Sequence, residues 1–375
     1  MEKVKHLLGI SGGKDSAALS IYMSQKYPTL DIEYYTCDTG KELKETYDLI
    51  GRLNSVLGKD IELYKSMDED NSPMKNPFDH FLAMYGGYLP SATARWCTGK
   101  MKLQPFEAHV GDEPTISYVG IRGDENREGY ISKRENIQTI FPFRKNIWSE
   151  DVIKKVLVNS NITLIKGYYN DIAVKEILPS ILQYVEQPIS PKFTQLQKLN
   201  ALMDIDLKLF NKVVFEFLKT TDYPIGKLDE FPLIENDEVI GLSAVFQILE
   251  ESGVGVPAYY KPIEYEVEID GEIKKGTYSR SRSGCFFCFY QQKIEWVWLL
   301  EQHPELYAKS IEYEKDGYSW MAEHLEDLKK PERVASIKKE HYLRMNRQKK
   351  KSRTGESWQD DILEAEGEGC ASCFI

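Results

Sequence analysis

The chain has 375 residues, 42% of them hydrophobic and 29% charged, which is the balance of an ordinary globular protein. No apolar run approaches the ~20 residues of a membrane helix, and the first residues are too charged for a signal peptide, so we expect a cytoplasmic protein with no membrane attachment. The formal net charge of −11 excludes a general attraction to nucleic acid.

The first part of the chain alternates apolar runs with helical patterns. Strands are predicted at 6–10, 31–38, 60–66 and 115–121, and helices at 17–27 and 43–58, the second ended by Gly58. Strands that alternate with helices indicate a parallel sheet with right-handed crossovers. The predicted fold class is therefore α/β, a parallel sheet with helices on both faces, and its ligands should bind at the carboxyl ends of the strands.

The pattern changes after Trp148. A helix is predicted at 149–160, a wholly helical stretch at 175–220, a hairpin at 266–279 around Asp270-Gly271, and helices from Lys293 to about Gln348. We divide the chain into a nucleotide-binding α/β domain (1–165), a mainly helical insertion (166–250), a cysteine-containing hairpin with helices (251–348), and a flexible tail (349–375).

One basic stretch stands out from the acidic background, KKEHYLRMNRQKKKSR at 338–353. It is either a solvated helix end that runs into a flexible tail or a contact for nucleic-acid phosphates. Both interpretations stay open.

The chain contains six cysteines, namely Cys37, Cys97, Cys285, Cys288, Cys370 and Cys373. In a reducing cytosol they are not expected to form structural disulfides. Two CxxC pairs, CFFC and CASC, indicate metal or sulfur chemistry instead.

The loop SGGKDS (11–16) follows the first strand and leads at once into a helix. Gly12 and Gly13 let backbone N–H groups approach an anion, and the helix N-terminus adds partial positive charge. Ser11 and Ser16 can donate hydroxyl groups, and Lys14 brings a full positive charge. Asp15 would repel phosphate unless it caps the helix or holds Mg²⁺. The loop is therefore predicted to bind a pyrophosphate group.

SGGKDS resembles the pyrophosphate loop of the PP-loop ATP pyrophosphatases, whose fold is of the adenine nucleotide α-hydrolase type. The resemblance implies that ATP is cleaved between its α and β phosphates and that a substrate oxygen is adenylated. It also implies that Lys14 and Asp15 act in catalysis, together with Arg122 and Arg127.

Three further segments resemble the PAPS reductase branch of that superfamily. They are YYTCDTGKELKET (34–46), RWCTGKMKLQPFE (95–107) and YVGIRGDENREGY (118–130). In the first, Asp38 would meet magnesium or the ribose, or else it caps the next helix. In the last, Arg122 and Arg127 would pair with phosphates, or else they form salt bridges with the acidic residues nearby.

A fourth segment, beginning RSGCFFCFYQQK at 282, resembles the late Gly-Cys-x-x-Cys block of the same branch. The resemblance makes Cys285 and Cys288 metal ligands, with Cys97 as a third thiolate. Three thiolates suit a [4Fe–4S] cluster with one open iron. Zinc is the alternative, with His303 or a tail cysteine as its fourth ligand.

The length and layout resemble the sulfurtransferases of bacterial DNA phosphorothioation systems, the Dnd and Ssp kinds. The resemblance implies a transferase in antiviral defence that adenylates a DNA phosphate and replaces a non-bridging oxygen with sulfur. Its partners would be a cysteine desulfurase as sulfur donor and the other phosphorothioation subunits.

Three other functions remain open. One is reduction of phosphoadenylyl sulfate or adenylyl sulfate, although the chain ends in GCASCFI and lacks the Glu-Cys-Gly-x-His tail of those reductases. Another is thiolation of a tRNA base by the same adenylation step. The third is a nucleotide-binding scaffold without catalysis, which would not require the loop residues and the cysteines together.

Overall fold

The computed structural model describes residues 3–66, 76–125, 131–315, 317–348, 359 and 362. The chain divides into two compact units, and each unit is assembled from separate segments. Unit 1 comprises Met1–Gly9, Tyr22–Glu33 and Val110–Gly241, and unit 2 comprises Ile10–Ile21, Tyr34–His109 and Leu242–Ile375.

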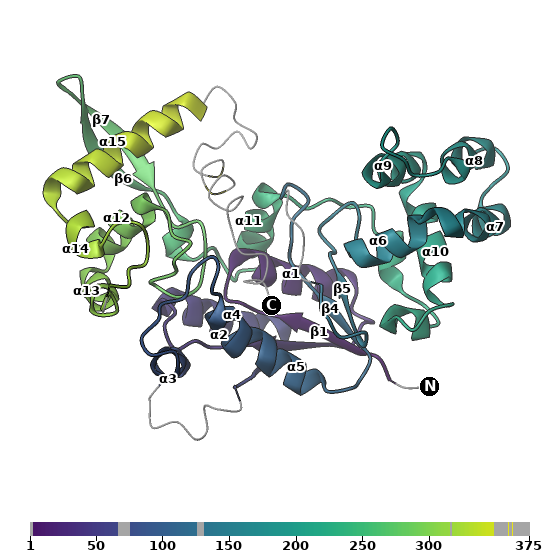
Figure 1. Ribbon diagram of the computed structural model, residues 1–375, viewed down its shortest axis with the longest axis horizontal. Coiled ribbons are helices and arrows are strands. Elements are labelled where there is room, and N and C mark those ends of the chain that lie inside the picture. The colour runs from purple at the N-terminus through teal and green to yellow at the C-terminus, as the bar shows by residue number, and fades with distance from the viewer. Residues whose placement is uncertain are drawn as a thin grey trace. The chain divides into compact units, whose positions relative to one another are not determined.

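A five-stranded sheet has the order β3-β2-β1-β4-β5 (Figure 1). Its strands are β1 (Lys5–Gly9), β2 (Ile32–Thr36), β3 (Ile61–Leu63), β4 (Thr115–Tyr118) and β5 (Ile137–Ile140). The pairs β1–β4, β2–β3 and β4–β5 are parallel, with Leu7 opposite Ser117 and Tyr118 opposite Ile140. Helices flank this sheet, so the predicted α/β class is confirmed.

The fifth strand, β5, was not predicted from the sequence. It has only four residues, and two of them, Gln138 and Thr139, are polar although both are buried. The Gln138 side chain accepts a hydrogen bond of 3.0 Å from the backbone N–H of Ile225. Buried polar residues in the strand hide its apolar signature.

The two helices that follow β1 and β2 begin and end close to the predicted residues. Helix α1 (Lys14–Lys26) begins three residues earlier than predicted, so Lys14, Asp15 and Ser16 belong to its first turn. Helix α2 (Lys44–Leu57) ends at Gly58, whose φ of 61° is the left-handed conformation that favours glycine.

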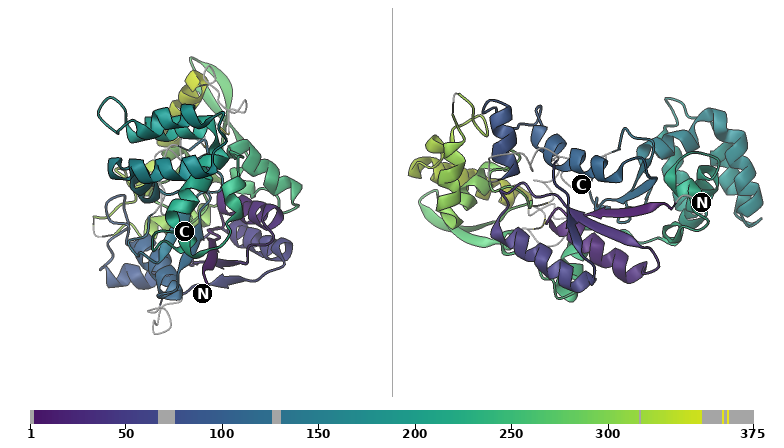
Figure 2. Two further views of the ribbon diagram at one scale, coloured as in Figure 1. Left: turned by 90° about the vertical axis from the view of Figure 1, so that its right-hand side faces the viewer. Right: turned by 90° about the horizontal axis from the view of Figure 1, so that it is seen from below.

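Unit 1 contains a group of helices, drawn in teal in Figure 1 and seen from two further sides in Figure 2. They are α6 (Glu150–Leu157), α7 (Ile162–Ile172), α8 (Leu178–Glu186), α9 (Gln195–Ile205) and α10 (Leu207–Leu218), with short 3₁₀ turns η3 (Asn159–Asn161), η4 (Pro224–Lys227) and η5 (Pro232–Glu235). Helix α10 packs against α7 and α9. Helix α8 also packs against α7 and α9.

The stretch 175–220 is not wholly helical as predicted. Residues 187–194 form a loop, where Ser190 and Phe193 make an isolated bridge. Asp206 then separates α9 from α10, because its carboxylate accepts a hydrogen bond of 2.9 Å from the backbone N–H of Leu209 and so caps α10.

Unit 2 contains the remaining elements. They are α3 (Pro77–Met84), α4 (Trp96–Thr98), η2 (Gly99–Leu103), α5 (Gln104–Val110), α11 (Leu242–Glu251), η6 (Ala258–Tyr260), β6 (Ile263–Ile269), β7 (Glu272–Tyr278), α12 (Lys293–Gln302), α13 (Pro304–Glu312), α14 (Leu325–Leu328) and α15 (Pro331–Gln348). Strands β6 and β7 form the predicted hairpin, which turns at Asp270 and Gly271 with φ of 54° and 80°.

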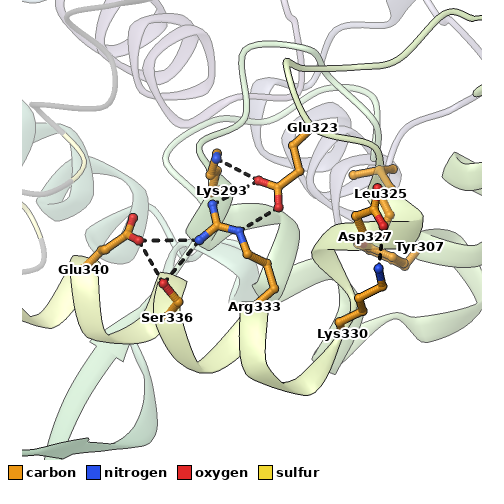
Figure 3. Close-up of polar contacts among 9 residues, drawn as sticks. All are labelled: Lys293, Tyr307, Glu323, Leu325, Asp327, Lys330, Arg333, Ser336 and Glu340. Atoms are coloured by element: carbon orange, nitrogen blue, oxygen red, sulfur yellow. Dashed lines mark hydrogen bonds and ion pairs between the residues drawn. The ribbon is translucent and has the colours of Figure 1, made fainter.

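The core of unit 2 is rich in aromatic residues. Phe287 stacks on Trp320 with ring centroids 4.7 Å apart, and Phe78 lies 4.5 Å from Phe287. A charged network covers part of this core (Figure 3), where the Arg333 guanidinium donates to both carboxylate oxygens of Glu323 at 2.6 and 3.0 Å. Lys293 bonds the same carboxylate at 2.8 Å, and so ties α12 to α15.

Among the described residues, no helix is both long enough and apolar enough to span a bilayer.

Candidate functional site

The loop between β1 and α1 is held in shape by its own hydroxyl groups. The Ser11 and Ser16 hydroxyls lie 3.1 Å apart, and Ser16 Oγ accepts a hydrogen bond of 3.2 Å from the Ser11 N–H. The Tyr259 hydroxyl donates to the Gly12 carbonyl at 3.3 Å. These bonds turn the chain sharply from strand to helix, and the Lys14 N–H donates to the Tyr260 hydroxyl at 3.4 Å.

The two loop glycines lie where no other residue fits without movement. Gly12 has a φ of 72°, and a Cβ there would lie 2.3 Å from Thr46 Cγ2 on α2. A Cβ on Gly13 would lie 2.7 Å from Ser283 Oγ. The loop is therefore packed tightly against two other segments of unit 2. The positive φ of Gly12 requires glycine there, whereas a side chain at Gly13 would displace the Ser283 hydroxyl.

Lys14 is buried, with only 1% of its surface exposed. Its ammonium group lies 3.2 Å from Asp15 Oδ2 and donates to the Ser281 carbonyl at 3.3 Å. The same nitrogen lies 4.9 Å from the centre of the Tyr260 ring, which adds a cation–π contact. Three neighbours thus fix a full positive charge beside the loop.

Glu295 supports this arrangement from α12. Its Oε1 accepts hydrogen bonds from the N–H and the hydroxyl of Ser281 at 2.6 and 2.8 Å. Its Oε2 accepts from the Gln292 N–H at 2.8 Å, as part of a capping box at the start of α12. Glu295 therefore orients the peptide whose carbonyl holds Lys14. Neither Ser281 nor Glu295 was predicted.

A single pocket in unit 2 is lined by both the loop and the three predicted metal-binding cysteines. Lys14 and Asp15 line it together with Cys97, Cys285 and Cys288. Cys97 lies in α4, whereas Cys285 and Cys288 lie in the segment between β7 and α12. The sequence prediction placed these groups in separate motifs, and the fold brings them to one place.

Burial of the three thiols favours their protonated forms. Burial raises the pKa of Cys97 to about 11, and the nearby Cys288 adds to this effect. Burial also raises the pKa values of Cys285 and Cys288 above their usual range. A bound cation would be needed to favour the thiolate forms.

Glu42 lies at the same pocket and was not predicted as a site residue. Its Oε1 accepts a hydrogen bond of 3.0 Å from the Thr39 hydroxyl, which itself lies 3.1 Å from Cys285 Sγ. Its Oε2 is buried and has no hydrogen-bond partner. Burial raises the pKa of Glu42, while Lys102 and hydrogen bonds from Thr39 and Cys285 oppose the increase.

The donor set of this pocket fits a thiolate-bound metal centre. Three thiols are soft donors that suit iron–sulfur clusters or zinc, and the free oxygen of Glu42 is a hard donor beside them. In the described parts of the chain, no three His, Cys, Asp or Glu side chains are already close enough together to hold a metal ion. Binding would have to draw the thiols together.

Other cations also line the pocket or support it. Lys102 and Arg282 are among its lining residues. Arg280 is buried and donates to the Cys285 carbonyl at 3.2 Å, which fixes the turn that carries the CxxC pair. The Arg280 side chain thus fixes the backbone at Cys285 in the absence of any ligand.

Several predicted residues lie elsewhere. Asp38 follows β2, does not line the pocket, and accepts hydrogen bonds from the Gly40 N–H and the Tyr47 hydroxyl at 2.7 and 2.8 Å. Arg122 lies in unit 1, fully buried, where it pairs with Asp124 at 2.9 Å and Glu125 at 2.7 Å.

Three predictions concern residues outside those that the structure describes. Arg127 is one, and the tail cysteines Cys370 and Cys373 are the others. His303 is described and does not line the pocket, since it ends α12 with its ring 5.2 Å from that of Trp298.

Comparison with known proteins gave one match. Residues 5–170 match the phosphoadenosine phosphosulfate reductase domain family. Comparisons with curated proteins and with solved structures found no match. The matched region contains the Gly-Gly-Lys loop and Cys97, in agreement with the resemblance inferred from the motifs. The chain therefore carries a PAPS reductase-like domain over residues 5–170, the domain of a nucleotide-using, sulfur-related enzyme family.

Proposed function

We propose that this protein is an ATP-dependent sulfurtransferase that acts on the phosphate backbone of DNA. The observation that carries the proposal is the shared pocket, where a buried lysine of an anion-binding loop and three cysteines line one space. An enzyme that only binds nucleotide has no need of the thiols, and an enzyme that only handles sulfur has no need of the loop.

The first step that we propose uses the loop. An oxygen of the acceptor phosphate attacks the α-phosphorus of ATP, and pyrophosphate leaves with the electrons of the broken bond. The N–H groups at the start of α1 and the ammonium of Lys14 stabilise the charge that develops on the leaving group. Asp15, 3.2 Å from Lys14, orients this ammonium or ligates the Mg²⁺ that accompanies ATP.

The second step replaces oxygen by sulfur. The terminal sulfur of a persulfide, formed by a cysteine desulfurase, attacks the activated phosphorus, and AMP leaves with the former phosphate oxygen. A thiol reductant then cleaves the S–S bond of the product and leaves the phosphorothioate. Cys97, Cys285 and Cys288 would hold a [4Fe–4S] cluster, which when bound supplies an iron site with affinity for sulfur. Lys102 and Arg282 line the same pocket and favour the thiolate forms that such binding requires.

The alternative functions predict different products. A PAPS or adenylyl-sulfate reductase would release sulfite with a thiol reductant and would not consume ATP. A tRNA thiolase would release pyrophosphate but place the sulfur on a base. Zinc in place of the cluster would leave the ATP chemistry and make the cysteines structural.

The first test is anaerobic purification followed by iron, zinc and acid-labile sulfide analysis. About four iron and four sulfide per chain are expected for a [4Fe–4S] cluster. Cys285→Ser should lose the brown chromophore, whereas Cys37→Ser, at a half-buried cysteine that does not line the pocket, should keep it. Zinc alone in the wild type would contradict the cluster.

The second test measures pyrophosphate release with ATP, DNA and a desulfurase. Lys14→Ala should abolish release without unfolding the protein, whereas Lys44→Ala, at an exposed lysine on α2, should leave it unchanged. Labelled sulfur should appear in phosphorothioate dinucleotides after nuclease digestion of the DNA. Sulfur recovered only in tRNA, or only as sulfite, would replace the proposal with the corresponding alternative.

A further inference from the structure

The most unusual polar atom of the pocket is Glu42 Oε2. It is buried and has no hydrogen-bond partner, although the other oxygen of the same carboxyl group is bonded to Thr39. Native proteins pair nearly all buried polar atoms, so an orphaned one at a pocket calls for a ligand. Thr39 and Cys285 both interact with this carboxyl group, yet its Oε2 atom accepts no hydrogen bond.

The backbone fixes Glu42 beside the CxxC turn. Glu42 and Cys285 form an isolated antiparallel bridge, and the Phe286 N–H donates to the Lys41 carbonyl at 2.9 Å. Thr39 contacts both side chains, at 3.0 Å from the carboxylate and 3.1 Å from the sulfur. Main-chain pairing therefore holds the backbone of Glu42 beside the CxxC turn, and Thr39 links its carboxyl group to the Cys285 sulfur.

We infer that Glu42 is the fourth protein ligand of the metal centre that Cys97, Cys285 and Cys288 bind. The inference rests on the proposed function, in which these cysteines hold a cluster. A carboxylate oxygen is a harder donor than a thiolate and binds iron less firmly. Such a ligand suits an iron site that must release it when sulfur binds, whereas a fourth cysteine would stay bound to the iron.

The other candidate ligands fit less well. His303 does not line the pocket, and its ring packs beside Trp298 with Nδ1 3.9 Å from the Glu305 carboxylate. Asp15 lines the pocket, but its carboxylate is paired with Lys14. Among the described residues that line the pocket, Glu42 has a buried carboxylate oxygen with no hydrogen-bond partner.

The test is anaerobic reconstitution of the full chain with iron and sulfide, followed by desalting, iron analysis and EPR. The variant is Glu42→Gln, which keeps the shape and removes the anionic donor. The matched control is Glu45→Gln, the same substitution at another carboxyl group with a buried, unpartnered oxygen, which does not line the pocket. Urea unfolding of the metal-free proteins is measured in parallel.

Wild type and Glu45→Gln should hold about four iron per chain. Glu42→Gln should hold about three, and oxidation of this sample with ferricyanide should give the EPR signal of an oxidised three-iron cluster. The metal-free Glu42→Gln protein should unfold at the same or a higher urea concentration, because an unsatisfied buried carboxyl is removed.

Three outcomes overturn the inference. A full four-iron cluster in Glu42→Gln overturns the ligand assignment alone and leaves the proposed function intact. Iron loss together with a lower urea midpoint in the metal-free protein makes Glu42 a structural residue. A wild type that takes up no iron overturns the cluster of the proposed function, and the Glu42 assignment with it.

Discussion

Replacing Gly12 with alanine tests how closely the loop between β1 and α1 is packed. At a φ of 72° an L-residue costs about 1–2 kcal/mol relative to glycine. The new methyl group would also lie 2.3 Å from Thr46 Cγ2, and overpacking of this kind costs about 1–3 kcal/mol. We therefore expect Gly12→Ala to lower the free energy of unfolding by about 2–5 kcal/mol.

A double-mutant cycle separates the two contributions. Thr46→Ser removes the clashing methyl group and keeps the hydroxyl, so in that background Gly12→Ala should cost about 1–2 kcal/mol. Gly58→Ala is the matched control, because Gly58 has a φ of 61° and no atom within 4 Å of an added Cβ. It should show the backbone cost alone.

Equilibrium urea unfolding of the four cycle members and the control measures these differences. If Gly12→Ala costs no more than Gly58→Ala, or if Thr46→Ser fails to relieve it, the loop is not packed against α2 as described. The geometric reason for glycine at this position would then be wrong.

Three more predictions concern single side chains. Tyr260→Phe keeps the ring near Lys14 and removes the hydroxyl that accepts the 3.4 Å hydrogen bond from the Lys14 N–H. Pyrophosphate release should therefore fall less than in Tyr260→Leu, and equal loss in the two variants would contradict the cation–π role. Hydrogen bonds from Arg333, then Lys293, hold the pKa of Glu323 at about 2. Because this pKa is depressed, Glu323→Gln should lower the free energy of unfolding by about 1 kcal/mol at pH 6, and by progressively less as the pH falls from about 4.5 toward 2. Urea unfolding measures this difference, and a difference independent of pH would refute the pairing of Glu323 with Arg333 and Lys293. Burial lowers the pKa of His6 to about 4, so its NMR signals should titrate near that pH. The free energy of unfolding should fall as the pH drops from about 6.5 to 4, because the unfolded chain binds the proton first. Titration of the His6 signals near 6.5 would show that His6 is exposed.

The sheet and its loop could be predicted because their signals are local. An apolar run, two glycines and an amphipathic helix follow one another within residues 6–27, so short-range physics fixes their order. The hairpin at Asp270-Gly271 is equally local, since both residues of a tight turn must adopt positive φ. Strand β5 was not predicted because two of its four residues, Gln138 and Thr139, are polar although they are buried.

The parts of the site that were missed depend on long-range contacts. Tyr260 and Ser281 contact Lys14 across more than two hundred residues of sequence, and nothing local marks either residue. Glu42 lay inside a quoted motif, but its significance depends on an oxygen that the folded chain leaves unpaired. Sequence patterns identify groups that can donate or bind, and only the packed structure shows which of them lack a partner.

The segmented origin of the pocket has a consequence for how the protein is made. The pocket combines residues as early as Ser11 with residues as late as Tyr290. During synthesis the early residues leave the ribosome long before the late ones exist, and domains fold as units only when their parts are present. Lys14 therefore lacks its contacts with Ser281 and Tyr260 until most of the chain has been translated. Any ligand of this pocket can therefore meet its final surroundings only after the segment that carries Ser281 to Tyr290 has left the ribosome.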